Sequence, residues 1–190
     1  MALDDSLPEL LARLLPSGTR FSPGVAAWLV IHIPAGITCV IAGALAALSR
    51  KRAGRHPKLG DVYCWALGVL FVSSSAVSVL RWPHDVHLLV MGLVSFGLAS
   101  AGYVARKVHW AGWTTIHVLG MGLSYIVLLT AFYVDNGPHL PLWNRLPPVA
   151  FWVGPGVIGL PLVGWGLARH CRPIEDLRLT IAFVRRRQRE

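Results

Sequence analysis

Two histidines stand inside apolar stretches of the chain. His32 lies in the stretch 25–48 and His117 in the stretch 113–134. Ionisable groups are costly inside a bilayer and are candidates for function there, so these imidazoles are the first residues to consider for chemistry. A neutral imidazole is a common ligand of transition metals and of haem iron. Met121 follows His117 by four residues, which places both on one helix face, and a thioether can also ligate haem iron.

Five long apolar segments must position these residues. A hydrocarbon core about 30 Å thick needs about 20 apolar residues in a helix. The chain of 190 residues is 54% hydrophobic and only 14% charged, which is typical of a membrane protein. The sequence predicts membrane-spanning helices over 25–48, 61–80, 86–105, 113–134 and 149–168. The connections between them are short, so we expect a single membrane domain over 1–190 with no separate soluble domain.

The basic residues are distributed unevenly over the predicted connections. With five spans, 14 of the 18 lysines and arginines fall on one side of the membrane, and Arg13, Arg20, Arg81 and Arg145 fall on the other. The basic side of a membrane protein is normally cytoplasmic, so we expect the N-terminus outside and the C-terminus in the cytoplasm of a cell inner (plasma) membrane. Attraction to anionic lipids on that side accounts for the net charge of +9 without a nucleic-acid partner.

Depth in the bilayer limits what the two histidines can do together. At 1.5 Å per residue, His32 lies about 10 Å below the outer edge and His117 about 6 Å above the inner edge, so they differ in depth by about 14 Å. They therefore do not ligate one metal or one haem iron. The outer partners that the sequence offers to His32 are His87, at the start of the third span, and His84; the inner partners that it offers to His117 are His109, His56 and Met121. His56 and His109 fall in basic connections, where we expect solvent exposure. Met121 shares a helix face with His117, so it does not lie across a porphyrin from it, and an axial partner would come from another helix.

A structural role for these histidines is the competing hypothesis. A single histidine in a membrane helix can hydrogen-bond a serine or a carbonyl of the next helix. The sequence has no phosphate-binding glycine loop, no H-E-x-x-H and no G-x-S-x-G. Asp61 and Asp135 lie at the ends of predicted spans and no carboxylate falls deeper within a span, which disfavours a proton-coupled transporter. The three cysteines, Cys39, Cys64 and Cys171, form no C-x-x-C motif, so the sequence does not predict a disulfide framework or a structural zinc site.

Small residues recur four positions apart in the predicted spans. Such pairs allow two membrane helices to approach closely. They are Gly43 and Ala47, Ser95 and Ala99, Gly97 and Ala101, Gly120 and Ser124, and Gly164 and Ala168. Outside the spans, residues 1–22 hold a short leucine-rich amphipathic segment, and residues 173–190 hold a basic one. We expect both to lie as helices on the membrane surface, flanking the five-helix bundle of 25–168.

Several short patterns together resemble a known group of proteins. They are the segment His32 to Gly36, Arg55-His56-Pro57 with Gly60 and Tyr63, Gly102-Tyr103 before Arg106-Lys107, and His117 with Gly120-Met121-Gly122 and Ser124-Tyr125. In these residues the chain resembles uncharacterised bacterial multi-pass membrane proteins that are grouped only as a domain of unknown function. The resemblance runs from about residue 28 to 168. It implies a small helical bundle in a bacterial inner membrane and implies no activity.

The sequence thus predicts an all-α integral membrane bundle of five transmembrane helices with short amphipathic helices at both ends. Two functions remain open. One is a redox or electron-transfer protein that holds haem b through His32, His87, His117 and Met121. The other is a non-catalytic accessory or assembly subunit that packs against a larger membrane complex. The sequence assigns no catalytic residue and identifies no other metal site.

Overall fold

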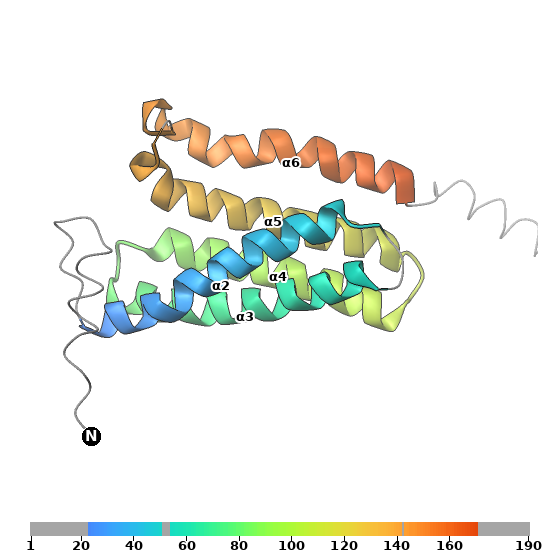
Figure 1. Ribbon diagram of the computed structural model, residues 1–190, viewed down its shortest axis with the longest axis horizontal. Coiled ribbons are helices and arrows are strands. Elements are labelled where there is room, and N and C mark those ends of the chain that lie inside the picture. The colour runs from blue at the N-terminus through green and yellow to red at the C-terminus, as the bar shows by residue number, and fades with distance from the viewer. Residues whose placement is uncertain (1–22, 51–53, 142, 171–190) are drawn as a thin grey trace, which may run out of the picture. The chain divides into compact units, whose positions relative to one another are not determined.

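A computed structural model describes residues 23–50, 54–141 and 143–170. Its helices are α2 (Pro23–Leu48), α3 (Arg55–Leu80), α4 (Val86–Val108), α5 (Trp113–Asn136) and α6 (Pro148–His170), with short 3₁₀ helices η1 (Gly137–His139) and η2 (Trp143–Arg145) after α5 (Figure 1). The described residues form no β-strand. All five α-helices are long and apolar enough to cross a membrane. The predicted all-α fold with five spans is confirmed, and the chain is a multi-pass membrane protein.

The start of α3 differs from the prediction. The sequence placed a proline- and glycine-broken loop up to Gly60, but the helix already begins at Arg55. Pro57 is compatible with this start because backbone N–H groups in the first turn have no intrahelical partner, so a proline costs little there. The amphipathic helices expected in 1–22 and 173–190 lie outside the described residues.

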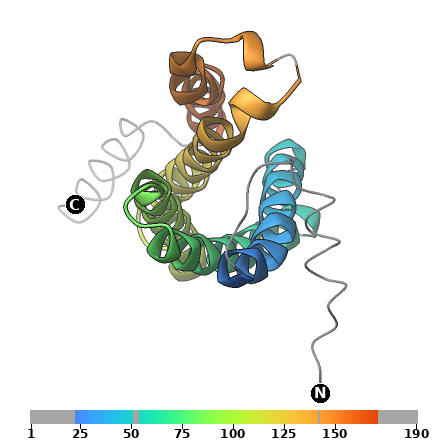
Figure 2. The ribbon, with the colours of Figure 1, turned by 90° about the vertical axis from the view of Figure 1, so that its left-hand side faces the viewer.

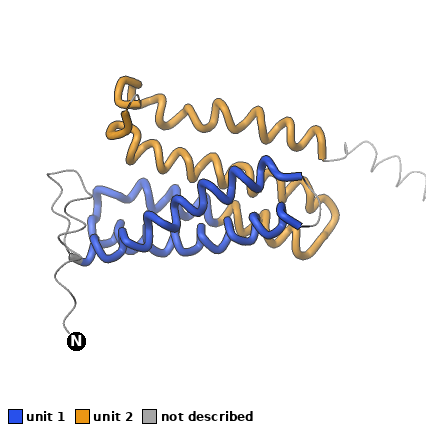
Figure 3. Tube along the Cα trace, in the orientation of Figure 1, with its two compact units in different colours: residues 1–96 blue, residues 97–190 orange. Residues whose placement is uncertain are grey.

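The chain divides into two compact units, Met1–Phe96 and Gly97–Glu190, with the division inside α4 (Figure 3). Among the described residues, unit 1 holds α2, α3 and the first half of α4. Unit 2 holds the second half of α4, α5, η1, η2 and α6. The expected single membrane domain stays a prediction.

In unit 1, α2 and α3 pack against each other as an antiparallel pair, and their buried side chains differ in size. Most buried side chains of α2 are small, and the buried face of α3 carries three large side chains beside two serines. Those on α2 are Val25, Ala35, Cys39, Ala42 and Ala46; those on α3 are Tyr63, Leu67, Leu70, Ser73 and Ser78. Gly24 lies against Leu80 and Gly36 against Leu70, so the helices run in opposite directions with a fixed register. Large side chains of α3 fill the space that the small ones on α2 leave.

In unit 2, glycines bring neighbouring helices into close contact. A methyl group at Gly120 would lie 2.6 Å from the carbonyl oxygen of Leu98 and 2.9 Å from the Cα of Gly102, so the backbones of α4 and α5 touch. Helices α5 and α6 run side by side in opposite directions (Figure 1). Seen from one end, they also lie next to each other (Figure 2). Gly122 packs on Val163, Gly159 on Ile126 and Gly137 on Phe151 along their length.

Helix α6 is the least buried span. Only 6% of its most apolar window is buried, against 33% for α3. Its exposed side chains are large and apolar, for example Ile158, Leu162 and Trp165. Such a surface suits lipid chains or the helix of another membrane protein.

Candidate functional site

His32 forms a hydrogen-bonded contact between α2 and α3. Its Nδ1 lies 3.1 Å from the hydroxyl oxygen of Ser73, and that hydroxyl donates to the backbone carbonyl of Leu70 at 2.9 Å. Because the single hydroxyl proton is directed to Leu70, Nδ1 of His32 is the donor to Ser73. Ser73 is buried and His32 half-buried. The small face of α2 described above holds the two helices close enough for this contact.

His117 forms the corresponding contact between α5 and α4. Its Nδ1 lies 3.0 Å from the carbonyl oxygen of Gly102, and a carbonyl accepts only, so Nδ1 donates. Along α5, His117 lies about one helical turn before Gly120, which also contacts Gly102. Met121 faces the same helix, since its Cγ lies 3.2 Å from where a Cβ of Gly102 would stand. The prediction that His117 and Met121 share a face agrees with this arrangement.

His56 also donates a hydrogen bond to a neighbouring helix, although we expected it to be exposed to solvent. Its Nδ1 lies 2.9 Å from the carbonyl oxygen of Ala46, which joins the first turn of α3 to the end of α2. Its position in a basic segment suggested a solvated loop residue, but α3 begins one residue before it and His56 is half-buried. Three imidazoles therefore each donate to an oxygen of a neighbouring helix.

His87 does not lie at the depth of His32. Ser73 lies beside His32, and the adjacent Ser74 lies 3.3 Å from where a Cβ of Gly92 would stand. His32 is therefore level with Gly92 on α4. His87 precedes Gly92 by five residues, or about 7.5 Å at 1.5 Å per residue. The backbone positions of the two histidines are thus offset along the helices, and their pairing stays a prediction.

The residues at the His117 contact leave little space for a large planar cofactor on the α4 side. A porphyrin there would have to separate two helices whose backbones touch at Gly102 and Gly120. Haem sites in helical bundles are built in the core from side chains on facing helices. Within the described part of the chain, no group of three or more His, Cys, Asp or Glu residues is placed to hold a metal ion.

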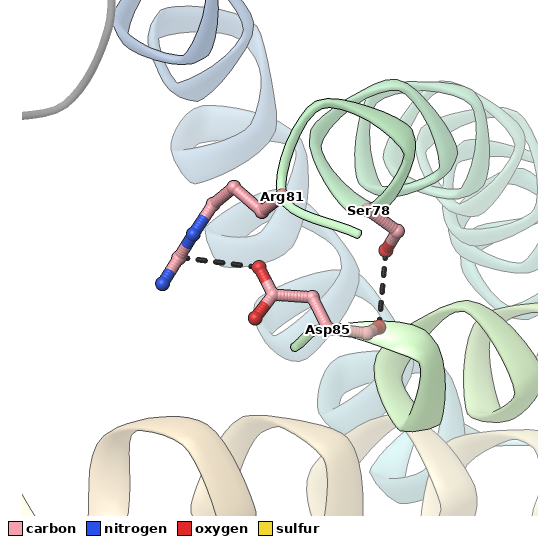
Figure 4. A network of polar contacts seen from close by, with 3 residues as sticks. All are labelled: Ser78, Arg81 and Asp85. Carbon is pink, nitrogen blue, oxygen red and sulfur yellow. Dashed lines mark hydrogen bonds and ion pairs between the residues drawn. The ribbon is translucent and has the colours of Figure 1, made fainter. Parts of the chain in front are cut away.

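A buried carboxylate that sequence reasoning missed lies in the turn between α3 and α4. Asp85 is 6% exposed, and its Oδ2 lies 3.1 Å from Nη1 of Arg81 as an ion pair (Figure 4). The same Oδ2 has no partner in hydrogen-bond geometry. The Asp85 carbonyl accepts a hydrogen bond from the hydroxyl of Ser78 at 3.2 Å (Figure 4). It also accepts from the N–H groups of Leu88 and Leu89. The spacing of four between Arg81 and Asp85 was the available signal, but an aspartate in a turn suggests solvent exposure.

Comparisons with protein-family models, with curated proteins and with solved structures found no match. The resemblance to uncharacterised bacterial membrane proteins therefore stays a prediction, and the geometry of the chain carries the functional argument.

Proposed function

We propose that the protein is a non-catalytic membrane subunit that packs against, or helps to assemble, a larger membrane complex. The observation that carries this choice is the contact of α4 with α5, where His117 donates to Gly102 beside touching backbones. An imidazole used in this way holds two helices together. The same use recurs at His32 and His56, which supports a structural role for these imidazoles.

Two outward pairs of small residues support association with other helices. The pairs Ser95 and Ala99, and Gly120 and Ser124, are buried inside the protein. In contrast, Gly97 and Ala101 on α4, and Gly164 and Ala168 on α6, are exposed. A methyl group at Gly97 or at Gly164 would meet no atom within 4 Å. Small residues on a lipid-facing surface allow the helix of a partner to approach closely, which is a common basis of helix association in membranes.

The test is whether partner binding depends on these outward glycines. The protein is extracted in mild detergent from its own membrane, and the ratio of co-purified subunits to the chain is measured. We expect Gly164→Ile to reduce that ratio at least several-fold, because a branched side chain prevents close approach. The matched control is Leu162→Ile, which keeps an apolar surface on the same helix. Equal recovery of subunits with both variants would contradict the proposal.

We place the chain in a bacterial inner (plasma) membrane with its N-terminus outside and its C-terminus in the cytoplasm. The uneven distribution of basic residues supports this orientation. In a cysteine-free background, a membrane-impermeant thiol reagent added to intact cells should label Asp135→Cys and spare Arg55→Cys. Both positions are exposed, so accessibility within the protein is matched. The reverse labelling pattern would overturn the orientation.

Haem b binding is the second candidate function. The favourable observation is that Nδ1 of His32 donates to Ser73, so a neutral ring carries its lone pair on Nε2, the nitrogen that commonly ligates haem iron. Histidine ligands of metals normally donate their other nitrogen to such a partner. Haem added to the purified protein would then give a saturable Soret shift that His32→Ala abolishes and His109→Ala preserves. The absence of a saturable shift would remove this candidate.

A further inference from the structure

Two cysteines of unit 1 lie at the same level of the α2–α3 pair. Cys39 precedes Leu48, the last residue of α2, by nine residues, and Cys64 follows Arg55, the first residue of α3, by nine residues. Because the two helices are antiparallel and joined at this end, each cysteine lies about 13.5 Å along its helix from the connection. Both side chains therefore start at the same depth, well inside the apolar spans.

Interhelical contacts on both sides of the cysteines fix this level. Toward the connection, Nδ1 of His56 reaches the carbonyl oxygen of Ala46 at 2.9 Å. Away from the connection, a Cβ added to Gly36 would lie 3.6 Å from Leu70. The two cysteines lie between these contacts on their respective helices, so the contacts hold them at a common level.

The two thiols lie at the α2–α3 contact. Cys39 is fully buried, on the face of α2 that also carries Ala35 and Ala42. Cys64 is half-buried and adjoins Tyr63, at the edge of the buried face of α3. The two thiols interact electrostatically, and no disulfide joins their sulfur atoms. The packing of the two helices therefore brings two sulfur atoms together without a covalent bond between them.

Two sulfur ligands inside a membrane span select one class of ion. Thiolates bind soft metal ions, whereas hard cations such as Ca²⁺ take several oxygen ligands. Zn²⁺ is normally tetrahedral, and the described residues place no third His, Cys, Asp or Glu beside the pair. A net charge is costly in apolar surroundings, and two thiolates neutralise one divalent cation. The ion that suits the pair is therefore soft, divalent and stable with two ligands in a line, as Hg²⁺ is.

We propose that Cys39 and Cys64 form a two-thiolate binding site for a soft divalent metal ion, with Hg²⁺ as the ion to test. Mercuric chloride is neutral, so it can enter lipid. A Cβ added to Gly60, one turn from Cys64, would meet no atom within 4 Å, so Cys64 can be approached from that side. Each thiol loses its proton, two sulfur–mercury bonds form, and two molecules of hydrogen chloride leave, so no electron is transferred. This site goes beyond the proposed function and does not depend on it.

The test is a titration of the full chain carrying Cys171→Ala with mercuric chloride, in the presence of glutathione as a competing monothiol. Native mass spectrometry should show one Hg²⁺ per chain, with the mass of two hydrogen atoms lost. Cys39→Ala or Cys64→Ala in this background should weaken Hg²⁺ retention by at least about 100-fold, because two sulfurs on one scaffold bind with a high effective concentration. Two Hg²⁺ ions per chain, or a mercury that keeps a chloride, would contradict a shared ion.

A moved thiol separates the site from the number of thiols. Cys64→Ala/Trp65→Cys keeps two cysteines at nearly the same depth, but Trp65 is 76% exposed and lies on another side of α3. This variant should retain Hg²⁺ no better than Cys64→Ala. Hg²⁺ should also raise the unfolding temperature of the parent and not that of the moved-thiol variant, because a bound ion stabilises the fold that positions both sulfurs. Thermal unfolding without Hg²⁺ shows whether each variant is folded. Equal retention by the parent and a folded moved-thiol variant would overturn the site.

Discussion

The contact of α2 with α3 and the contact of α4 with α5 both bring two helices close together, but they do so with different residues. In the first, small residues of α2 receive the large side chains of α3, and His32 donates to a serine hydroxyl. In the second, glycines on both helices bring backbones together, and His117 donates directly to a backbone carbonyl. His117 therefore reaches a carbonyl where the backbones touch, and His32 meets a hydroxyl on α3 where side chains fill the space between the helices. His56, at the end of the α2–α3 contact, also reaches a carbonyl.

The difference shows where each contact tolerates change. Side chains can rotate to accommodate added atoms, whereas touching backbones can only move apart. In lipid there is no hydrophobic force between helices, so close packing and interhelical hydrogen bonds carry their association. The α4–α5 contact should therefore resist added volume, and the α2–α3 contact should be most sensitive to lost volume.

The largest effect should follow from one methyl group at the α4–α5 contact. Gly120→Ala should lower the free energy of unfolding by about 3 kcal/mol, because the added Cβ would lie 2.6 Å from the Leu98 carbonyl oxygen. Unfolding in mixed micelles, followed by circular dichroism as sodium dodecyl sulfate is added, measures this. Gly97→Ala is the control, since its Cβ meets nothing within 4 Å. Similar losses in both variants would contradict the backbone contact.

The α2–α3 contact should respond to a truncated side chain. Leu67→Ala should lower the free energy of unfolding by about 2 kcal/mol, at the low end for leucine truncation because transfer from water contributes little in lipid. Leu67 is 2% exposed, while Val69 on the outer side of the same helix is 46% exposed. Val69→Ala should cost less than about 0.5 kcal/mol in the same assay. A cost for Val69→Ala as large as that for Leu67→Ala would show that these faces are misassigned.

Loss of an interhelical imidazole should have a moderate effect. His117→Phe should lower the free energy of unfolding by about 1 kcal/mol, within the range measured for interhelical hydrogen bonds in membranes. His84→Phe, at an exposed position in the turn before α4, should leave it nearly unchanged. The free energy of unfolding of His32→Phe can then be compared with that of His117→Phe, because His32 donates to a hydroxyl and His117 to a carbonyl. Full stability in His117→Phe would mean that the ring has another purpose.

The smallest effect is expected outside both helix contacts, at the ion pair of the α3–α4 turn. Arg81→Gln should change the free energy of unfolding by less than about 0.5 kcal/mol, because the Arg81 side chain is 43% exposed and solvent screens its charge. The same denaturation assay gives the value. A loss comparable to that of Leu67→Ala would show that the turn contributes to stability as much as a helix contact.

The sequence predicted the helices well because long apolar runs follow directly from the thickness of a bilayer. It also predicted that His117 and Met121 share a face, since spacing alone decides this. A span that is apolar on all sides does not reveal which side faces its neighbours, however, so the sequence did not show that His32 points toward Ser73. The burial of Asp85 was missed for a related reason: it depends on how the turn folds back and not on local composition.

The central claim is that the intramembrane histidines hold helices together and that the protein acts through association with other membrane subunits. Native mass spectrometry of the protein released directly from its own membrane tests both parts at once. The account predicts complexes heavier than the 20.7 kDa chain by the mass of partner subunits, with no haem component. A chain that carries one stoichiometric haem, lost in His32→Ala or His117→Ala, and that has no protein partner would contradict it.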